Sequence, residues 1–265
     1  MTARTPPPVS QPAGVRRQAG IVALARECGR VLVDDLAARF AMTPQTIRRD
    51  LNELCEAGVL TRVHGGAIVA SSVENLAYEA RKLVALDQKQ RIGQAAARLV
   101  PDHSSLFINL GTTTEEVARA LSGRSGLLVV TNNVNVATEL ARSPAISVVL
   151  AGGSVRAADG GIVGHMAVQL IRQFSVDLAV IGTSAIDADG TLLDYDLREV
   201  QVSRAIIENA RRVILVADSS KFTRRAPVRI ATLDEIDVLV TDHLPAETRR
   251  TLAERHDIEV IATGE

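Results

Sequence analysis

Apolar residues near the N-terminus recur at helical spacing. Over residues 44–54, the apolar positions Ile47, Leu51 and Leu54 are four and three residues apart, so they share one face of a helix. Thr43 and Pro44 stand directly before this stripe. A threonine hydroxyl accepts from the free N–H groups of a first helical turn, and proline at the first helical position loses no hydrogen bond. The pattern therefore predicts a helix that begins at Pro44.

A second, shorter amphipathic pattern precedes this helix. Residues 33–40 place Leu36, Ala37 and Phe40 on one face, which predicts a short helix. Only two residues then remain before Thr43, enough for a tight turn. This order and spacing are typical of a helix-turn-helix.

A hairpin pattern follows the second helix. Apolar runs at 59–63 and 67–69 flank Gly65-Gly66, and two glycines can adopt the positive φ angles of a two-residue hairpin turn. A hairpin in this position is the wing of a winged helix-turn-helix. We therefore expect such a domain over residues 16–70.

From residue 106 onward, short apolar runs alternate with stretches of helical apolar spacing. The runs that we expect to be strands are 106–108, 127–130, 146–150, 178–181, 213–216 and 238–240. The helical stretches between and after them are 115–121, 134–141, 168–173, 199–210 and 246–256. Such alternation predicts a buried, mostly parallel sheet with helices on both faces, an α/β fold, over residues 87–265.

The expected second helix and the wing carry side chains that suit duplex DNA. Arg can grip guanine with two hydrogen bonds, Gln can do the same for adenine, and Thr or Arg can hold phosphates. The candidate DNA-binding residues are Thr43, Gln45, Thr46, Arg48, Arg49, Arg62 and His64. Asp50 has the opposite charge, and we expect it to pair within the protein. A capped helix with two arginines is usually a solvated surface helix when taken alone, but the order of the elements favours DNA binding.

Small and polar residues follow five of the expected strands. Ligands of an α/β sheet bind outside the carboxyl ends of the strands, and glycines, hydroxyls and a lysine suit an anion there. The candidate effector-binding residues are Gly111, Thr112, Thr113, Thr131, Asn132, Asn133, Gly152, Gly153 and Lys221. Each loop alone is as well explained by a turn or a helix cap. Five loops at one sheet edge favour a site, and a phosphorylated small molecule is the simplest ligand.

Length and charge divide the chain in the same place. A chain of 265 residues is longer than one core usually supports. Residues 1–70 carry nine Lys or Arg and six Asp or Glu, a net charge of +3, whereas residues 71–265 carry 21 and 25, a net charge of −4. The small basic excess falls in the expected DNA-binding part. We expect residues 1–15 to be a disordered tail and residues 71–86 to be a linker.

Other features narrow the class of protein. Cys28 and Cys55 show neither metal-ligand spacing nor a disulfide framework, which fits a reducing cytoplasm. No apolar run approaches the ~20 residues of a membrane span, and residues 1–14 lack the apolar stretch of a signal peptide. The sequence Asp187-Ala-Asp-Gly190 is typical of a turn, because further spaced ligands are missing. We therefore expect a cytoplasmic protein with no metal, no cofactor and no membrane partner.

Two sets of motifs resemble the DeoR family of bacterial transcriptional repressors. TIRRDL, the capped turn before it and RVHGGA after it resemble the DNA-binding domain of that family. GTTTEEVA, TNNVNVA, LAGGSVR, DGGIVG, RAIIENA and DSSKF resemble its effector domain, which is similar to the sugar-phosphate isomerase fold. The resemblance covers nearly all of residues 16–242. It implies a repressor that releases double-stranded operator DNA when a phosphorylated metabolite binds, and a homo-oligomer, with a tetramer suggested.

Two positions depart from the family pattern. Asn109 stands where the family often has an acidic residue, which alters the charge beside the expected phosphate loop. Ser203 stands where a lysine is common, which removes a possible ligand contact. Within the family, the motifs LAGG, RxxDGGIVG, QF, ID-x-DG, REV and RAIIEN together resemble members that respond to glycerol 3-phosphate. This resemblance implies glycerol 3-phosphate as the effector, and another sugar or polyol phosphate is the alternative.

An enzyme of the sugar-phosphate isomerase type is the competing hypothesis. Its acid and base groups would come from Asp187, Asp189, Glu199 and Lys221. Similarity of fold does not establish chemistry. A DNA-binding domain ahead of the α/β domain favours sensing over turnover, so we expect no enzyme activity.

Overall fold

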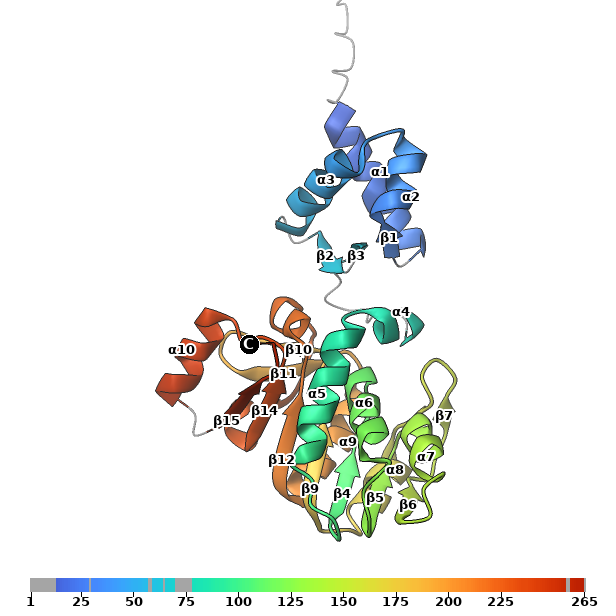
Figure 1. Ribbon diagram of the computed structural model, residues 1–265, viewed down its shortest axis with the longest axis vertical. Helices are drawn as coiled ribbons and strands as arrows, with labels where there is room; N and C mark the ends of the chain where they lie inside the picture. Colours follow the sequence, from blue (N-terminus) through green and yellow to red (C-terminus); the bar gives the residue numbers. More distant parts are fainter. Residues whose placement is uncertain are drawn as a thin grey trace, which may run out of the picture. The chain divides into compact units, whose positions relative to one another are not determined.

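The chain divides into two compact units, Met1–Ala70 and Ser71–Glu265. Figure 1 shows their helices and strands in a computed structural model. Each unit has a buried apolar core of its own. The residues that the structure describes are 13–28, 30–56, 59–63, 65–69, 78–255 and 258–264.

The N-terminal unit is a winged helix-turn-helix, as the sequence predicted. Its described elements are α1 (Ala13–Cys28), β1 (Arg30–Leu32), α2 (Val33–Phe40), α3 (Pro44–Glu56), β2 (Leu60–Val63) and β3 (Gly66–Val69). The three strands form an antiparallel sheet in the order β1-β3-β2. The apolar stripe of α3 is buried, and Ile47 and Leu51 pack with Ile21 of α1 and Leu36 of α2. This packing fixes which face of α3 remains outside.

The turn of the wing differs from the sequence-based expectation. Val63 and Gly66 are paired across β2 and β3, so the loop consists of residues 64 and 65, and the prediction of Gly66 as a turn residue was wrong. Gly65 has a φ of 73°, which the turn requires. A Cβ at Gly66 would lie 1.9 Å from the carbonyl oxygen of Val31. Gly66 is therefore needed for the close approach of β1 to β3, a strand pair that apolar periodicity did not reveal.

The C-terminal unit is built on a seven-stranded sheet. In sheet order its strands are β15 (Glu259–Ala262), β14 (Val238–Thr241), β12 (Ala210–Val216), β9 (Val176–Ile181), β4 (Ser105–Ile108), β5 (Leu127–Thr131) and β6 (Ile146–Leu150). All neighbouring strands are parallel. The predicted α/β fold is confirmed, and β15 at the edge is the one strand of this sheet that the apolar runs did not predict.

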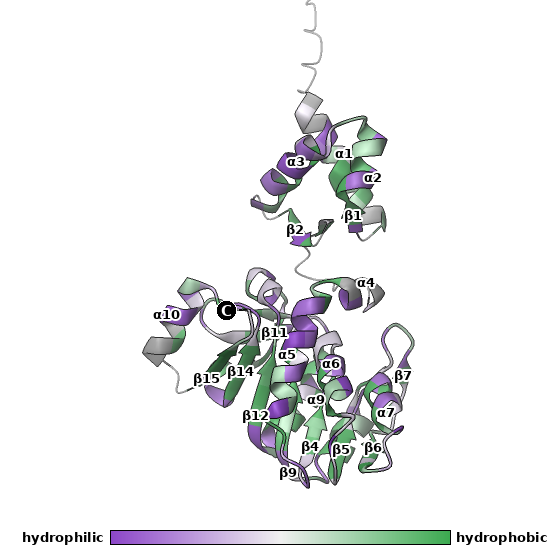
Figure 2. Cartoon of the chain, in the orientation of Figure 1, coloured by the Kyte–Doolittle hydropathy of each residue, from purple (hydrophilic) through white to green (hydrophobic). Residues whose placement is uncertain are grey.

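Helices cover both faces of this sheet (Figure 1). On one face, α5 (Leu86–Arg98), α6 (Thr112–Leu121) and α7 (Val134–Leu140) share a core with the strands. On the other face lie α8 (His165–Ile171) and α9 (Leu197–Glu208), and α10 (Ala246–Arg255) adds Leu252 to the same core. Figure 2 shows the apolar residues concentrated in the strands between these layers. Among the described residues, no helix has the length and apolar character needed to cross a membrane.

The strand order creates a topological switch point. β4 is the first strand of the sheet along the chain and lies in its middle, with β5 and β6 on one side and β9, β12, β14 and β15 on the other. Ligands of such sheets bind in the crevice outside the carboxyl ends of the strands where the order reverses. That crevice lies between β4 and β9.

Smaller elements extend the carboxyl edge of the sheet. They are β7 (Val155–Arg156), β8 (Gly161–Ile162), β10 (Ala185–Ile186), β11 (Thr191–Asp194), β13 (Val228–Thr232) and two short 3₁₀ helices, η1 (Ser219–Thr223) and η2 (Leu233–Glu235). β10, β11 and β13 form a separate antiparallel sheet, and β7 pairs with β8. Residues 187–190 form the expected turn, since the N–H of Gly190 donates to the carbonyl of Asp187 at 2.9 Å.

Three α-helices of the described residues occur where the sequence predicted none. α1 begins at Ala13, inside the expected tail, α4 (Tyr78–Leu83) lies inside the expected linker, and α5 begins at Leu86, where that linker was expected to end. α4 is held to the C-terminal unit because the hydroxyl of Tyr78 donates to Glu115 at 2.8 Å and the amino group of Lys89 donates to the carbonyl of Arg81. These contacts come from residues distant in the chain, so local periodicity does not show them.

Gly93 of α5 sets how closely α5 packs on α6. A Cβ there would lie 2.7 Å from the carbonyl carbon of Glu116. We predict that Gly93→Ala lowers the free energy of unfolding by about 1–3 kcal/mol, the usual cost of overpacking, although alanine favours a helix by about 1 kcal/mol over glycine. Gly123→Ala is the control, because a Cβ at Gly123 meets no atom within 4 Å. Urea denaturation measures both variants, and equal stability would contradict the close contact.

Candidate DNA-binding surface and effector cleft

The start of α3 is fixed by its cap. Ala41 ends α2 in the left-handed conformation, with φ 50° and ψ 46°. The Thr43 hydroxyl oxygen then accepts a hydrogen bond from the backbone N–H of Thr46 at 3.2 Å, as the sequence predicted. The hydroxyls of Thr43 and Thr46 are themselves 2.9 Å apart. The cap therefore holds both threonines at the first turn of α3.

The outward face of α3 carries three further candidates. The side chains of Gln45, Arg48 and Arg49 are exposed, and Figure 2 shows this helix as largely hydrophilic. Arg49 pairs with Glu53 at 3.1 Å, but the two side chains are 83% and 49% exposed. A pair this exposed is worth about 1 kcal/mol or less. A phosphate group can therefore replace Glu53 as the partner of Arg49.

The buried acidic residue of α3 is neutralised inside the fold. Asp50 is buried and accepts hydrogen bonds from Nε and Nη2 of Arg17 in α1, at 2.5 and 3.0 Å. The hydrogen bonds to Asp50 raise the pKa of Arg17. The expectation that Asp50 pairs within the protein is confirmed. This pair joins α1 to α3 and keeps the negative charge off the outward face.

The wing contributes one described candidate. Arg62 on β2 is exposed. His64 lies outside the residues that the structure describes. The structure thus brings five predicted DNA-binding residues together on the first turns of α3, with Arg62 on the wing of the same unit.

A small cleft lies at the carboxyl ends of β4 and β9, at the switch point. Its lining comes from α4, the loop after β4, the loop after β9, the end of β11 and η1: Arg81, Leu110, Gly111, Thr112, Thr113, Thr114, Gly182, Thr183, Ser184, Asp194, Val216 and Lys221. The cleft has a volume of about 20 Å³, close to the space of one water molecule. A ligand with several heavy atoms therefore enters only if the side chains that line the cleft move.

The first turn of α6 faces this cleft. Gly111 precedes the helix with a φ of 144°, a conformation that favours glycine. The hydroxyl oxygen of Thr114 lies 2.8 Å from the carbonyl oxygens of both Asn109 and Gly111, which ties the loop to the end of β4. The first N–H groups of a helix have no acceptor within it and carry the positive end of its dipole. The loop therefore suits a phosphate group.

Cationic side chains gather around the same cleft. Lys221 and Arg81 line it, and Arg224 and Lys89 are close enough to act on Lys221 electrostatically. Burial lowers the pKa of Lys221 well below its ordinary value and lowers the pKa of Lys89 to about 8. In the described part of the chain, the buried Nε atoms of Arg81 and Arg224 have no hydrogen-bond partner. A bound anion would stabilise these charges.

Two acidic groups with raised pKa values, Asp194 and Glu199, lie near these cations, and Asp194 lines the cleft. Burial raises the pKa of Asp194, a cleft residue whose oxygens can accept hydrogen bonds from ligand hydroxyls. Burial and the nearby Asp194 raise the pKa of Glu199 to about 7. The Glu199 carboxylate does not line the cleft and accepts a 2.8 Å hydrogen bond from Arg156. Asp194 is therefore the acidic residue placed to contact a ligand.

The predicted effector residues divide into two groups. Gly111, Thr112, Thr113 and Lys221 line the cleft. The remaining five follow β5 and β6 and lie outside its lining. Thr131 and Asn132 are buried and donate to backbone carbonyls at 2.6 and 3.0 Å, and Asn133 caps α7. Gly152 and Gly153 are exposed.

Sequence reasoning missed several side chains of the cleft. Arg81 was assigned to the linker, and Lys89 belongs to a helix that was not predicted. Asp194 ends a strand of the separate small sheet. The sequence did hold a signal for Arg224, because this arginine stands three residues after Lys221, which was itself predicted to bind the effector.

The two departures from the family pattern are hydrogen-bonded to each other. The Asn109 side-chain amide donates to the Ser203 hydroxyl at 2.8 Å, and both residues are buried. The Ser203 hydroxyl donates in turn to the Glu199 carbonyl at 3.1 Å. An uncharged pair therefore joins the end of β4 to α9, with its polar groups satisfied.

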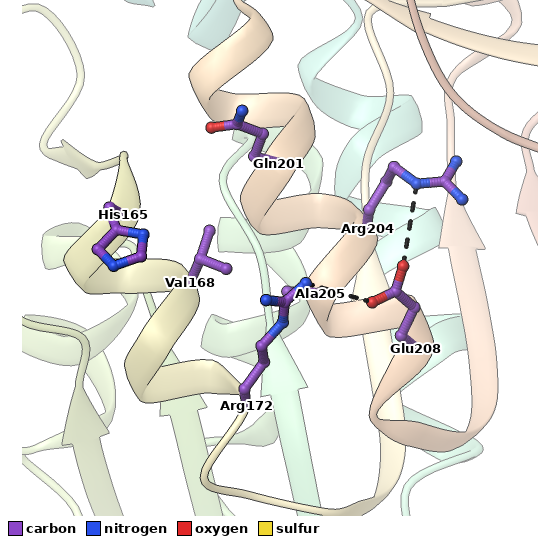
Figure 3. Close-up of a pocket in the computed structure, with 7 residues that line it drawn as sticks. All are labelled: His165, Val168, Arg172, Gln201, Arg204, Ala205 and Glu208. Carbon is purple, nitrogen blue, oxygen red and sulfur yellow. Dashed lines mark ion pairs between the residues drawn. The ribbon is translucent and has the colours of Figure 1, made fainter.

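A second hollow lies between α8 and α9, away from the strand ends (Figure 3). It has a volume of about 310 Å³ and is lined by His165, Val168, Arg172, Gln201, Arg204, Ala205 and Glu208. Arg172 and Arg204 both turn toward Glu208, at 3.9 and 4.0 Å. Two arginines of this hollow thus share one carboxylate.

Known proteins resemble the chain along nearly its whole length. Residues 17–73 match the DeoR-like helix-turn-helix domain, and residues 84–243 match the DeoR C-terminal sensor domain. The chain is 47% identical to a glycerol-3-phosphate regulon repressor of Haemophilus influenzae over 248 residues, which covers 94% of this chain and 97% of that protein. It is 43% identical to a glycerol-3-phosphate regulon repressor of Escherichia coli over 245 residues, covering 92% and 97%.

Among solved structures, ribose 5-phosphate isomerase A from Methanocaldococcus jannaschii is similar with a TM-score of 0.40 and 16% identity, covering 52% of this chain and 55% of that chain. The sensor-domain match alone spans more than half of the chain. The helix-turn-helix match lies ahead of it, in the order of the two units of the structure. The chain therefore belongs to the DeoR family, with a helix-turn-helix domain followed by a sensor domain.

Proposed function

We propose that this protein is a DNA-binding transcriptional repressor of a carbon-metabolism operon, and that glycerol 3-phosphate releases it from its operator. The observation that carries the proposal is the cleft, where a helix N-terminus and buried cations meet at the switch point of a sensor domain. The relatives reported above are named for the glycerol-3-phosphate regulon. Their identity over nearly the full chain supports the same ligand here.

On the DNA side, α3 would enter the major groove. Its exposed Gln45 and Arg48 suit base edges, because both can form paired hydrogen bonds there. Thr43, Thr46 and Arg49 suit phosphates, and the wing would add Arg62 and His64 beside the duplex. The exposure of Thr43, Gln45, Arg48, Arg49 and Arg62 supports these roles, and Thr46 is half-buried.

On the effector side, the phosphate would lie over the first turn of α6. The N–H groups of Thr112 and Thr113, the Lys221 amino group and the Arg81 guanidinium would share its charge, and Asp194 would accept hydrogen bonds from the hydroxyls. Because the cleft has a volume of only about 20 Å³, the effector would favour an opened arrangement of the sensor domain. A ligand releases the operator only if it binds the DNA-incompetent arrangement more tightly.

Another sugar or polyol phosphate is the alternative effector, since the phosphate contacts are common to all of them. Binding of the purified protein to its own upstream DNA, titrated with glycerol 3-phosphate and a panel of sugar phosphates at fixed salt, decides between them. Release by glycerol 3-phosphate at the lowest concentration is expected. Release by a different phosphate would reassign the effector, and no DNA binding at all would overturn the repressor.

An isomerase-like enzyme is supported by one specific observation. Glu199 has a pKa of about 7, a value suited to a general base. Its carboxylate is, however, held by Arg156 and does not line the cleft. Together with the names of the relatives as repressors, this supports sensing over turnover. Measurable isomerisation of a sugar phosphate by the purified protein would overturn that conclusion.

The repressor would act as a homo-oligomer in the cytoplasm. Helix-turn-helix proteins read paired half-sites, so each DNA-binding unit needs a symmetry-related partner. We propose a tetramer, as the family resemblance suggests. Sedimentation equilibrium of the full chain, with and without operator DNA, measures its mass.

The arginines of α3 should determine the salt dependence of operator binding. We predict that Arg48→Ala with Arg49→Ala weakens binding and flattens the slope of log affinity against log salt by about 0.9 for each lost phosphate contact. Arg142→Ala is the matched control, because it also removes an exposed arginine paired with a nearby acid, Glu139, but in the sensor unit. Fluorescence anisotropy across a salt titration measures the slopes. An unchanged slope in the double variant would contradict the assignment.

Lys221 should be needed for effector binding and not for DNA binding. We predict that Lys221→Met weakens glycerol 3-phosphate binding by about tenfold or more, because a charge-assisted hydrogen bond contributes about 1.5–3 kcal/mol, while operator affinity stays unchanged. Gly152→Ala tests the loops outside the cleft; a Cβ there meets no atom within 4 Å, and binding should stay as in the wild type. Titration calorimetry measures both. If Gly152→Ala weakened glycerol 3-phosphate binding more than Lys221→Met did, the effector would lie beside β6.

Effector binding should take up protons in mildly alkaline solution. Free Lys89 has a pKa of about 8 because burial disfavours its charged form. A nearby dianion raises the pKa of Lys89 and of Lys221. The affinity for glycerol 3-phosphate is therefore highest below pH 8, and it falls as the pH rises through the higher pKa that Lys89 has in the complex. Calorimetry at about pH 8.5 in buffers of different ionisation enthalpy measures the protons exchanged. Proton release, or an affinity that rises with pH, would contradict this prediction.

A further inference from the structure

Arg81 differs from the other residues that line the cleft in the structural element to which it belongs. It lies on α4, the first described helix of the C-terminal unit, which follows the DNA-binding unit after residues 71–77. The rest of the lining comes from the loops and strand ends at the carboxyl edge of the main sheet, from the first turn of α6, from β11 and from η1. Arg81 is therefore the cleft residue nearest in the chain to the DNA-binding unit.

The present ion pair of Arg81 is replaceable. Its Nη2 lies 3.4 Å from Oδ2 of Asp159, and its buried Nε has no hydrogen-bond partner within the described part of the chain. Asp159 is already held by Nε and Nη2 of Arg156, at 2.8 and 2.7 Å, and by the N–H of Gly161 at 3.1 Å. Asp159 therefore remains hydrogen-bonded if Arg81 leaves it, and a phosphate in the cleft offers Arg81 a doubly charged acceptor.

α4 has a second attachment close to the phosphate loop. The Tyr78 hydroxyl donates to Oε2 of Glu115, in the first turn of α6, at 2.8 Å. The side-chain amide of Asn135 reaches both, at 2.9 Å to the Tyr78 hydroxyl and 3.0 Å to Oε1 of Glu115. Glu115 is buried and directly follows the threonines of the cleft. A shift of the first turn of α6 on phosphate binding would therefore act on α4 through Tyr78 as well as through Arg81.

We infer that α4 is the element that couples effector binding to DNA release. In this arrangement the phosphate replaces Asp159 as the partner of Arg81, and α4, which follows the DNA-binding unit in the chain, moves with Arg81 to open the cleft. The cleft volume of about 20 Å³ requires such an opening. The inference rests on the proposed function, and it adds which residues sense the ligand directly and which transmit.

The test separates binding from release. Titration calorimetry measures glycerol 3-phosphate affinity, and fluorescence anisotropy measures the concentration that releases half of the operator DNA. Tyr78→Phe removes the hydroxyl that donates to Glu115 and accepts from Asn135, and it keeps the ring. We expect its glycerol 3-phosphate affinity to stay within twofold of the wild type, while the releasing concentration rises about tenfold, the effect of a coupling of roughly 1.4 kcal/mol.

Arg81 should combine both roles. For Arg81→Gln we expect about tenfold weaker glycerol 3-phosphate binding and a larger rise in the releasing concentration. Arg81→Lys should recover part of the binding but less of the release, because a lysine keeps the charge and loses the planar hydrogen-bonding geometry. Arg98→Gln is the control: it removes an exposed cation from α5, and Arg98 does not line the cleft. It should change neither quantity.

The outcomes are distinguishable from failure of the proposed function. If the wild type binds no phosphate compound, or binds one without leaving the operator, the proposed function is wrong. If the wild type responds, and Tyr78→Phe and Arg81→Gln change release only as much as they change binding, α4 is not the coupling element. Thermal denaturation of each variant identifies any that fail to fold, and Arg81→Lys then replaces Arg81→Gln in the comparison.

Discussion

Excess positive charge, partly buried at the switch point of the sheet, is the constraint on which the sensor unit depends. Lys221, Lys89, Arg81 and Arg224 converge there, and burial depresses the pKa of both lysines. Asp218 offsets part of the charge, and its own pKa falls, against the effect of burial, because Lys221 and Lys89 are close. Together with the first turn of α6, these groups favour an anionic ligand over a neutral one. The cleft is closed around them, which links binding to movement.

In the DNA-binding unit, the buried charge that needs a partner is an acidic one. Its buried acidic residue on α3, Asp50, is paired with Arg17, so the first turns of the outward face carry Arg48 and Arg49 without an exposed acidic residue. The same pair fixes α1 against α3. The proposed DNA contacts come from exposed side chains of α3, and the cap at Thr43 fixes where this helix begins. The residues of α3 that stabilise the fold thus lie on its buried face, and the proposed DNA-binding residues lie on its exposed face.

Local signals in the sequence were sufficient to predict the fold class and six of the seven strands of the main sheet. The cap at Thr43, the stripe of α3 and the apolar runs of the parallel strands each depend on residues close in the chain. The cleft was only half predictable. Gly111 to Thr113 and Lys221 follow strands directly, but Arg81 and Asp194 reach the cleft through tertiary contacts of a short helix and a separate small sheet. The loops after β5 and β6 share the composition of binding loops, yet their side chains serve backbone hydrogen bonds and a helix cap.

A crystal structure of the full chain with glycerol 3-phosphate tests the central claim most directly. The account predicts phosphate oxygens at about 2.7–3.2 Å from the N–H groups of Thr112 and Thr113 and from the amino group of Lys221, in an enlarged cleft with Arg81 turned from Asp159 to the ligand. A phosphate bound beside Gly152 and Gly153, with the cleft at the switch point still closed, would contradict it.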